Sequence, residues 1–298
     1  MWREGYVPGG DVRFWVRALG HGDDVVVLLH GWPQDGSSWR RVAPLLAGAG
    51  HRVIAPDLKG FGRTEAPGSP YDPETLADEV SQLIRNLHVR KAVLVGHDWG
   101  GAVALATAFR HPGRVRGVVL ASSPYRQVDL RRAWHIPLLN LPLLPEVAFR
   151  TAAVPILRRA FDHAAVVREP FTDEVVAGYA EAIRHAPADW LAYYRTLART
   201  AAVDWTVRQV RSRLPFVAAP PRPNSLRVPA LVAWGEQDPV TPVSLARRVA
   251  DDLEAGLVTF PGVGHFLPEE DPLAFSRALV RFVRRRCALP PDDEAARA

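Results

Sequence analysis

The residue best suited to chemistry is Asp98, which stands in the segment Gly96–Gly101 (GHDWGG). This segment follows a short apolar run and precedes a stretch of helical character. A Gly-X-nucleophile-X-Gly pattern in that context is typical of a sharp turn that exposes a nucleophile, because side chains at the glycine positions would clash with the neighbouring strand and helix. The helix start would also supply backbone N–H groups and the positive end of the helix dipole. We therefore predict that Asp98 is a nucleophile rather than a simple helix cap.

Two later segments contain the partners that such a nucleophile needs. Asp238 lies in WGEQDP and His265 in GVGHF, each just after an apolar run. Residues that follow the carboxyl ends of parallel strands meet along one edge of the sheet. We predict that His265 activates water as a general base, and that Asp238 orients its ring and stabilises the imidazolium. Glu236 is the nearest competitor for the acid role, and Asp271 is a more distant one.

A third segment, His30–Pro33 (HGWP), directly follows the apolar run Val25–Leu29. A loop at this position can aim the backbone N–H of Trp32 at the same point as the N–H of Trp99, and two such donors form an oxyanion hole. Pro33 would hold the turn, and a cis Trp32–Pro33 bond is one way to do so. Alone, the segment is an ordinary Gly-Pro loop. Next to a nucleophile, it predicts that Trp32 and Trp99 supply the oxyanion hole.

A carboxylate nucleophile restricts the class of substrate. Attack by serine on an epoxide or an alkyl halide would leave an ether, which water does not readily cleave. Attack by Asp98 leaves an ester, which water activated by His265 can hydrolyse. The substrate should therefore present an sp³ electrophilic carbon rather than an acyl group, and the oxyanion hole would act on the carbonyl of Asp98 in the second step.

The elements that must position these residues are indicated by short apolar runs bounded by turn residues. The runs are Val25–Leu29, Val53–Pro56, Ala92–Val95, Val115–Leu120, Ala230–Trp234 and Leu257–Phe260. Runs of this kind that alternate with helical segments predict an α/β fold, with a mostly parallel sheet covered by helices on both faces. Phe14–Ala18 could add an antiparallel strand at the edge.

The stretch between the fourth and fifth runs has a different texture, rich in Arg, Ala, Pro and aromatic residues and without strand–helix alternation. We predict helices at Glu174–His185 and Ala188–Ala201, and an irregular return linker at Leu214–Pro223 (LPFVAAPPRP). A helical cap is thus inserted into the sheet domain. The predicted units are a first core part at 1–124, the cap at 125–227, a second core part at 228–289 and a frayed tail at 290–298.

Composition argues against several other classes of protein. The 37 basic and 32 acidic residues give a net charge of +5, but the arginines are scattered, which indicates no nucleic-acid partner. The single cysteine, Cys287, allows no internal disulfide and no cysteine-based metal cluster, and no metal or organic cofactor is implied. No apolar run reaches membrane-spanning length and Met1–Gly5 lead into no signal segment, so we expect a soluble, cytoplasmic protein. The oligomeric state stays open, with a homodimer among the alternatives.

These motifs together resemble those of the α/β-hydrolase superfamily, and within it the branch of epoxide hydrolases and haloalkane dehalogenases. The likeness rests on HGWPQDGSSW, DLKGFGRT, GHDWGG, WGEQDP and GVGHF. Many haloalkane dehalogenases are similar at GHDWG but carry Asn or Glu where Trp32 stands. Several also take their acid from the fourth strand, where this chain offers Ser122 and Ser123. Fluoroacetate dehalogenases carry Arg in place of Trp99. These departures favour an epoxide hydrolase.

The resemblance also implies two cap side chains that hold the epoxide oxygen, commonly a pair of tyrosines. The segment Trp190–Arg195 (WLAYYR) resembles the family's N-W-Y-R segment and maps one donor to Tyr194, with Tyr193 as the adjacent alternative. Where relatives carry the other tyrosine, this chain has His135, and one divergent group of epoxide hydrolases pairs His with Tyr. Packing within the cap is the alternative role for His135.

The sequence thus predicts an epoxide hydrolase that converts a small apolar epoxide to a vicinal diol through an alkyl ester on Asp98. One alternative is a haloalkane dehalogenase, in which the indole N–H groups of Trp32 and Trp99 would bind the halide. Another is a non-catalytic ligand-binding protein on the same scaffold. The complete nucleophile, base and acid argue against that alternative, because binding alone needs no matched acid and base.

Overall fold

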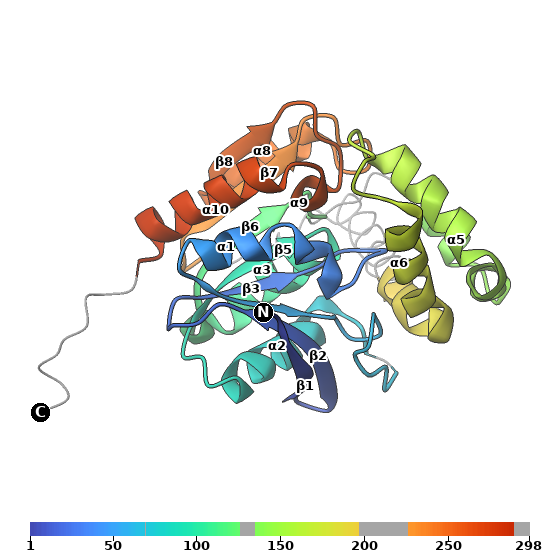
Figure 1. Cartoon of the computed structure of the whole chain (residues 1–298), viewed down its shortest axis with the longest axis horizontal. Coiled ribbons are helices and arrows are strands. Elements are labelled where there is room, and N and C mark those ends of the chain that lie inside the picture. Colours follow the sequence, from blue (N-terminus) through green and yellow to red (C-terminus); the bar gives the residue numbers. More distant parts are fainter. Residues whose placement is uncertain (69, 126–134, 197–225, 289–298) are drawn as a thin grey trace, which may run out of the picture.

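A computed structural model describes residues 1–68, 70–125, 135–196 and 226–288 (Figure 1). Its centre is an eight-stranded sheet in the order β1-β2-β4-β3-β5-β6-β7-β8. The strands are β1 (Arg3–Gly9), β2 (Val12–Leu19), β3 (Val25–Leu29), β4 (Arg52–Pro56), β5 (Ala92–His97), β6 (Val115–Ala121), β7 (Ala230–Gly235) and β8 (Gly256–Phe260). β2 is antiparallel to both β1 and β4, and all other neighbouring pairs are parallel.

The six predicted apolar runs are confirmed as the six strands β3 to β8. Phe14–Ala18 lies within the antiparallel strand β2, but its predicted edge position is wrong, because β1 pairs along its outer side. The sequence of β1, REGYVPG, contains two glycines and a proline, and most of its residues are exposed. An exposed edge strand needs no apolar alternation, so periodicity alone could not reveal it.

Helices cover both faces of the sheet, as predicted. α1 (Ala43–Gly48) and α10 (Pro272–Arg286) pack on one face, whereas α2 (Pro73–Asn86), α3 (Trp99–Arg110) and α8 (Val243–Leu253) pack on the other. Alternate residues of a strand point to opposite faces. The interior strand β3 therefore contributes Val26 and Leu28 to one apolar core and its remaining residues to the other. The short helices are η1 (Gly36–Arg40), η2 (Pro112–Arg114) and α9 (Leu267–Glu270).

The described residues between β6 and β7 form a group of helices beside the sheet, where α5 and α6 stand together (Figure 1). The described elements are α4 (His135–Leu139), α5 (Leu144–Ala164), α6 (Asp173–His185) and a further helix through 187–196. We call them the inserted helices. None of the described helices combines the length and apolar character that crossing a bilayer requires.

Two of the inserted helices match the predictions, and α5 was not predicted. α5 contains Pro155, and Ala152 has non-helical backbone angles one turn earlier, so its helical pattern is interrupted. Residues 197–201 of the second predicted helix, the predicted linker at Leu214–Pro223 and the tail at 290–298 lie outside the described residues. The predicted boundaries of the cap, at 125 and 227, lie next to residues outside the described ranges, so they stay predictions.

Candidate active site

The Asp98 side chain stands at the turn between β5 and α3, at the carboxyl edge of the sheet. Its backbone has φ 46° and ψ −120°, a strained conformation outside the helical region. A Cβ atom on Gly96 would collide with the backbone of Gly100, and one on Gly100 would collide with the carbonyl of Leu29. The glycines therefore let strand, turn and helix approach closely enough to present Asp98 at the edge, as the sequence predicted.

Two backbone N–H groups converge on the Asp98 carboxylate. The N–H of Trp32 donates to Oδ2 at 3.0 Å, and the N–H of Trp99 donates as well. Gly31 makes this approach possible, because a Cβ atom there would lie 2.5 Å from the Cβ of Asp98. The Trp32–Pro33 bond is cis. Burial raises the pKa of Asp98, while His265 and the two N–H donors favour the ionised form.

The ring of His30 fixes the peptide unit that carries the Trp32 donor. Its Nδ1 lies 3.0 Å from the carbonyl oxygen of Gly31, and its Nε2 accepts from the N–H of Leu58 at 2.8 Å. Burial lowers the pKa of His30 to about 4, so the ring is neutral and its one proton sits on Nδ1. The carbonyl of Gly31 and the N–H of Trp32 belong to the same planar peptide, so holding one orients the other.

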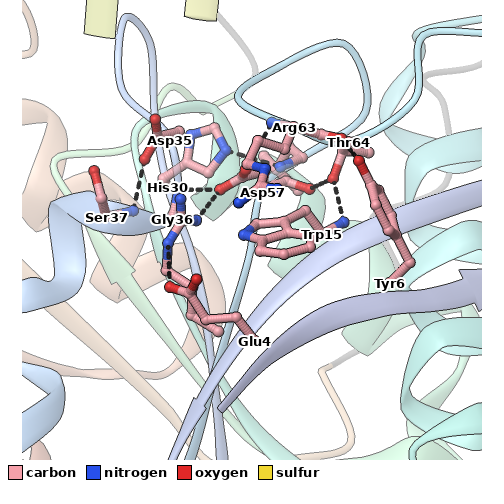
Figure 2. Close-up of polar contacts among 12 residues, drawn as sticks. Glu4, Tyr6, Trp15, His30, Asp35, Gly36, Ser37, Asp57, Arg63 and Thr64 are labelled. Carbon is pink, nitrogen blue, oxygen red and sulfur yellow. Dashed lines mark hydrogen bonds and ion pairs between the residues drawn. The ribbon is translucent and has the colours of Figure 1, made fainter. Parts of the chain in front are cut away.

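The loop that contains Leu58 is held in turn by the buried carboxylate of Asp57 (Figure 2). Asp57 forms an ion pair with Arg17 and accepts from the N–H groups of Gly36 at 2.8 Å and Arg63 at 2.9 Å. Burial raises the pKa of Asp57 to about 7, and Arg17 opposes that rise. The sequence predicts no role for His30 or Asp57. The segment HGWP, which contains His30, pointed only to the donor Trp32, and DLKGFGRT, which contains Asp57, only to the family resemblance, because the hydrogen-bond partners of these buried side chains cannot be inferred from local pattern.

His265 and Asp238 meet at the same edge of the sheet. Nδ1 of His265 lies 2.8 Å from Oδ2 of Asp238, and Asp238 also accepts from the N–H of Thr241 at 2.9 Å and from its hydroxyl at 2.6 Å. Burial alone would raise the pKa of Asp238, but His265 and Thr241 outweigh it and lower that pKa. Burial alone would lower the pKa of His265, but Asp238, followed by Asp98 and Glu270, raises it to about 9.

The two other carboxylates considered for the acid role make different contacts. Glu236 accepts from the hydroxyl of Thr259 at 2.7 Å on the exposed side of its loop. Asp271 caps α10, where it accepts from the N–H of Ala274 at 3.0 Å. Of the three candidates, Asp238 is the one that contacts His265.

The adjacent tyrosines of helix 187–196 have separate environments. Tyr194 lines the cavity that also contains Asp98 and His265, and its hydroxyl group hydrogen-bonds with the side chain of Trp99. The hydroxyl of Tyr193 instead donates to the backbone carbonyl of Lys59 at 2.8 Å, which fastens the helix to the core. His135 begins α4, and its side chain lies outside the described part of the chain.

A cavity of about 1250 Å³ opens above Asp98, between the sheet edge and the inserted helices. Trp32, Trp99 and His265 form part of its wall near the nucleophile. Its apolar lining includes Ile136, Leu139, Phe149, Ile156 and Leu245. Such a wall suits an apolar molecule whose reactive centre meets a few polar groups at one end. Among the described residues, no group of three or more His, Cys, Asp or Glu side chains is arranged to hold a metal ion.

Comparison with known proteins places this fold among the α/β hydrolases. Epoxide hydrolase 3 of Xenopus tropicalis is 26% identical over 293 residues, covering 94% of this chain and 74% of that protein. A soluble epoxide hydrolase of Corynebacterium sp. is 29% identical over 262 residues, covering 83% and 85%. The crystal structure of Cfl2 from Burkholderia cenocepacia has a TM-score of 0.78 at 27% identity, covering 94% and 95%. The family described as alpha/beta hydrolase fold matches residues 24–272, and the chain belongs to that family.

Proposed function

We propose that the protein is an epoxide hydrolase that converts an apolar epoxide to a vicinal diol. The observation that carries this proposal is the hydroxyl of Tyr194, which lines the same cavity as Asp98 and His265. A carboxylate nucleophile, a histidine base and a phenol donor are the three groups that opening an epoxide through an ester requires. The relatives named as epoxide hydrolases support the same reaction.

In the first step, the Asp98 carboxylate attacks an oxirane carbon, and the carbon–oxygen bond at that carbon breaks as the ester forms. The departing oxygen takes the phenol proton of Tyr194. Burial raises the pKa of Tyr194 well above its ordinary value, so this proton is in place before the reaction. His135 is the second proposed oxygen donor, on the basis of its place in the sequence.

In the second step, His265 takes a proton from water, and the hydroxide attacks the ester carbonyl of Asp98. The N–H groups of Trp32 and Trp99, which donate to the Asp98 carboxylate, would stabilise the tetrahedral oxyanion. Collapse breaks the ester bond, and the diol oxygen takes the proton from the imidazolium. The proton left on the Asp98 carboxyl restores the phenol of Tyr194.

Ester formation itself would prepare the base for this step. In the free protein the pKa of His265 is about 9, because Asp238 and then Asp98 favour the imidazolium. Alkylation converts the Asp98 carboxylate to a neutral ester and removes one of these negative charges. The pKa of His265 then falls, and a larger fraction of the ring becomes available as the neutral base.

A parallel panel of epoxides and haloalkanes tests the proposal. We expect diol from apolar epoxides and no halide from short haloalkanes. One reason is that a halide site would need the indole N–H of Trp99, which already hydrogen-bonds to Tyr194. Halide release without diol formation would contradict the proposal and show that the protein is a haloalkane dehalogenase. No turnover of either class, with ligands nevertheless bound, would favour a non-catalytic binding protein.

A further inference from the structure

The backbone of the loop that carries His265 has an unusual set of hydrogen-bond acceptors. The N–H of Gly264 donates to Glu270 Oε2 at 2.9 Å, and the N–H of Phe266 donates to Glu270 Oε1 at 2.9 Å. Between them, the N–H of His265 donates to the carbonyl of Ala164 at 2.9 Å. Three successive N–H groups are thus bound by one buried carboxylate and by the last residue of α5.

The same carboxylate also holds the chain that leaves α5. Glu270 Oε2 accepts from the N–H of Val166 at 2.8 Å and from the N–H of Val167 at 2.9 Å. The two segments approach so closely that a Cβ atom on Gly264 would lie 2.5 Å from the carbonyl oxygen of Ala164. Glu270 therefore joins the base loop and the end of an inserted helix into one hydrogen-bonded unit.

The charges around His265 come from several elements. Asp238 and Asp98 follow two different strands, Glu270 lies in α9, and all three favour the imidazolium. His97, whose Nε2 lies 2.9 Å from the carbonyl oxygen of His265, is neutral because burial lowers its pKa to about 3. In the described part of the chain, the Glu270 carboxylate is bound by backbone amides rather than by a cation, so its negative charge is not cancelled by a neighbouring side chain.

We propose that Glu270 is a positioning residue for His265, which fixes the base loop against the end of α5 and places a negative charge beside the imidazolium. The inference rests on the proposed function for its catalytic consequence. Glu270 accepts hydrogen bonds from the loop that carries His265 and not from the groups proposed to open the epoxide ring. Removing the Glu270 carboxylate should therefore impair hydrolysis of the ester rather than formation of the ester. The contact between the end of α5 and the loop of His265 thereby becomes a condition for the second step.

The decisive variant is Glu270→Gln, followed through single turnovers with an epoxide that the parent protein hydrolyses. We expect the rate of ester formation to stay near that of the parent, because the Glu270 carboxylate accepts hydrogen bonds from the base loop and from the chain after α5. Hydrolysis should slow by about tenfold to a hundredfold, the range that a small displacement of a catalytic group produces, so the alkyl-protein accumulates in intact-protein mass spectra. Removing the negative charge should also lower the pKa of His265, which moves the acid limb of the hydrolysis rate to lower pH.

Glu236→Gln is the matched control. It makes the same isosteric change at the same edge of the sheet, but its carboxylate accepts from the Thr259 hydroxyl instead of the base loop. We expect parental rates for both steps in this variant. A thermal melt of each variant establishes that it is folded.

Gly264→Ala separates position from charge. The added methyl group would lie 2.5 Å from the carbonyl oxygen of Ala164 and 3.0 Å from Oε1 of Glu270, so it would displace the loop, whereas Glu270 keeps its charge. We expect slower hydrolysis with the acid limb shifted less than in Glu270→Gln. This variant also decides the question if Glu270→Gln does not fold, because a parental rate of hydrolysis in Gly264→Ala would overturn the proposal.

Other outcomes would overturn the proposal directly. A folded Glu270→Gln variant with parental hydrolysis and an unmoved acid limb would do so, as would equal slowing of both steps, which indicates only general structural support. Titration of the His265 ring by NMR in Glu270→Gln tests the electrostatic part without any epoxide. If the parent itself forms neither ester nor diol, the proposed function fails, whereas a lowered His265 pKa in the variant would still support the link between these residues.

Discussion

The loop that carries Asp98 and the loop that carries His265 lie at the same edge of the sheet but are held in different ways. The glycines that flank Asp98 shape its turn, and the backbone N–H groups of Trp32 and Trp99 donate to its carboxylate. The His265 loop is bound through Glu270 and Ala164 to the end of α5. The nucleophile is therefore positioned by the sheet domain itself, and the base partly by the inserted helices.

The inserted helices dock on the core through two adjacent glutamates. Glu270 binds the chain after α5, while Glu269 accepts from Tyr179 of α6 at 2.9 Å and from Gln34 of the core at 2.6 Å. The buried Glu269 also forms an ion pair with the partly exposed Arg40. Because helix 187–196 supplies Tyr194 as well, the proposed chemistry divides into a nucleophile from the core and an oxygen donor from the insertion. The following predictions test that division, beginning with the largest expected effect.

Asp98→Ala should abolish ester formation, with a loss of about 10⁴-fold or more in turnover, because the attacking carboxylate is removed. Since hydrogen bonds of Glu270, Glu269 and Tyr193 dock the inserted helices, the melting temperature should stay near that of the parent. Rapid-quench assays and intact-protein mass spectrometry after mixing with the epoxide would test both points. Substantial residual diol formation would mean that water attacks directly, without a covalent ester.

His265→Gln should stall the second step while the first continues. General-base catalysis contributes about 10²- to 10⁴-fold, so hydrolysis should slow by a factor in that range. The protein should then gain the mass of one substrate on the peptide that contains Asp98. Near-normal turnover without an adduct would show that His265 is not the base.

Tyr194→Phe and Tyr193→Phe form a matched pair on the inserted helix. Loss of an oxyanion donor typically costs about 100- to 1000-fold, so Tyr194→Phe should slow ester formation by about that factor and leave hydrolysis of the ester unchanged. Tyr193→Phe removes only the hydrogen bond to Lys59, so it should destabilise the fold by about 1 kcal/mol and leave both steps near parental rates. The reverse result would exchange the roles of the two tyrosines.

The smallest expected effect is a shift along the pH axis. His265 in the free protein should titrate near pH 9, with the imidazolium below that pH. In the alkyl-protein, the lost charge of Asp98 lowers that pKa, so the rate of ester hydrolysis should rise with pH through a midpoint below 9. Stopped-flow measurement of hydrolysis against pH, beside an NMR titration of the free protein, compares the two midpoints. Equal midpoints would show that the charge of Asp98 does not influence the pKa of His265.

Much of the fold was determined by local sequence. Short apolar runs predicted β3 to β8, because a buried parallel strand must be apolar along its whole length. The glycines around Asp98 predicted a sharp turn, because close approach of strand and helix excludes side chains there. β1 and α5 were not predicted, because neither has a continuous local pattern. The exposed edge strand lacks a pattern, and Pro155 breaks the pattern of the helix.

Only the tertiary structure decided which neighbours share a site and which do not. Tyr193 and Tyr194 are adjacent in the sequence, yet one fastens the helix and the other faces the cavity. The hydrogen bond from Val166 to Glu270 joins residues 104 positions apart, and the sequence around either residue does not predict it. Backbone sterics and apolar periodicity act over a few residues, so the sequence records them directly. The partner of a buried polar group depends on which distant segments pack together, and that is settled only when the chain has folded.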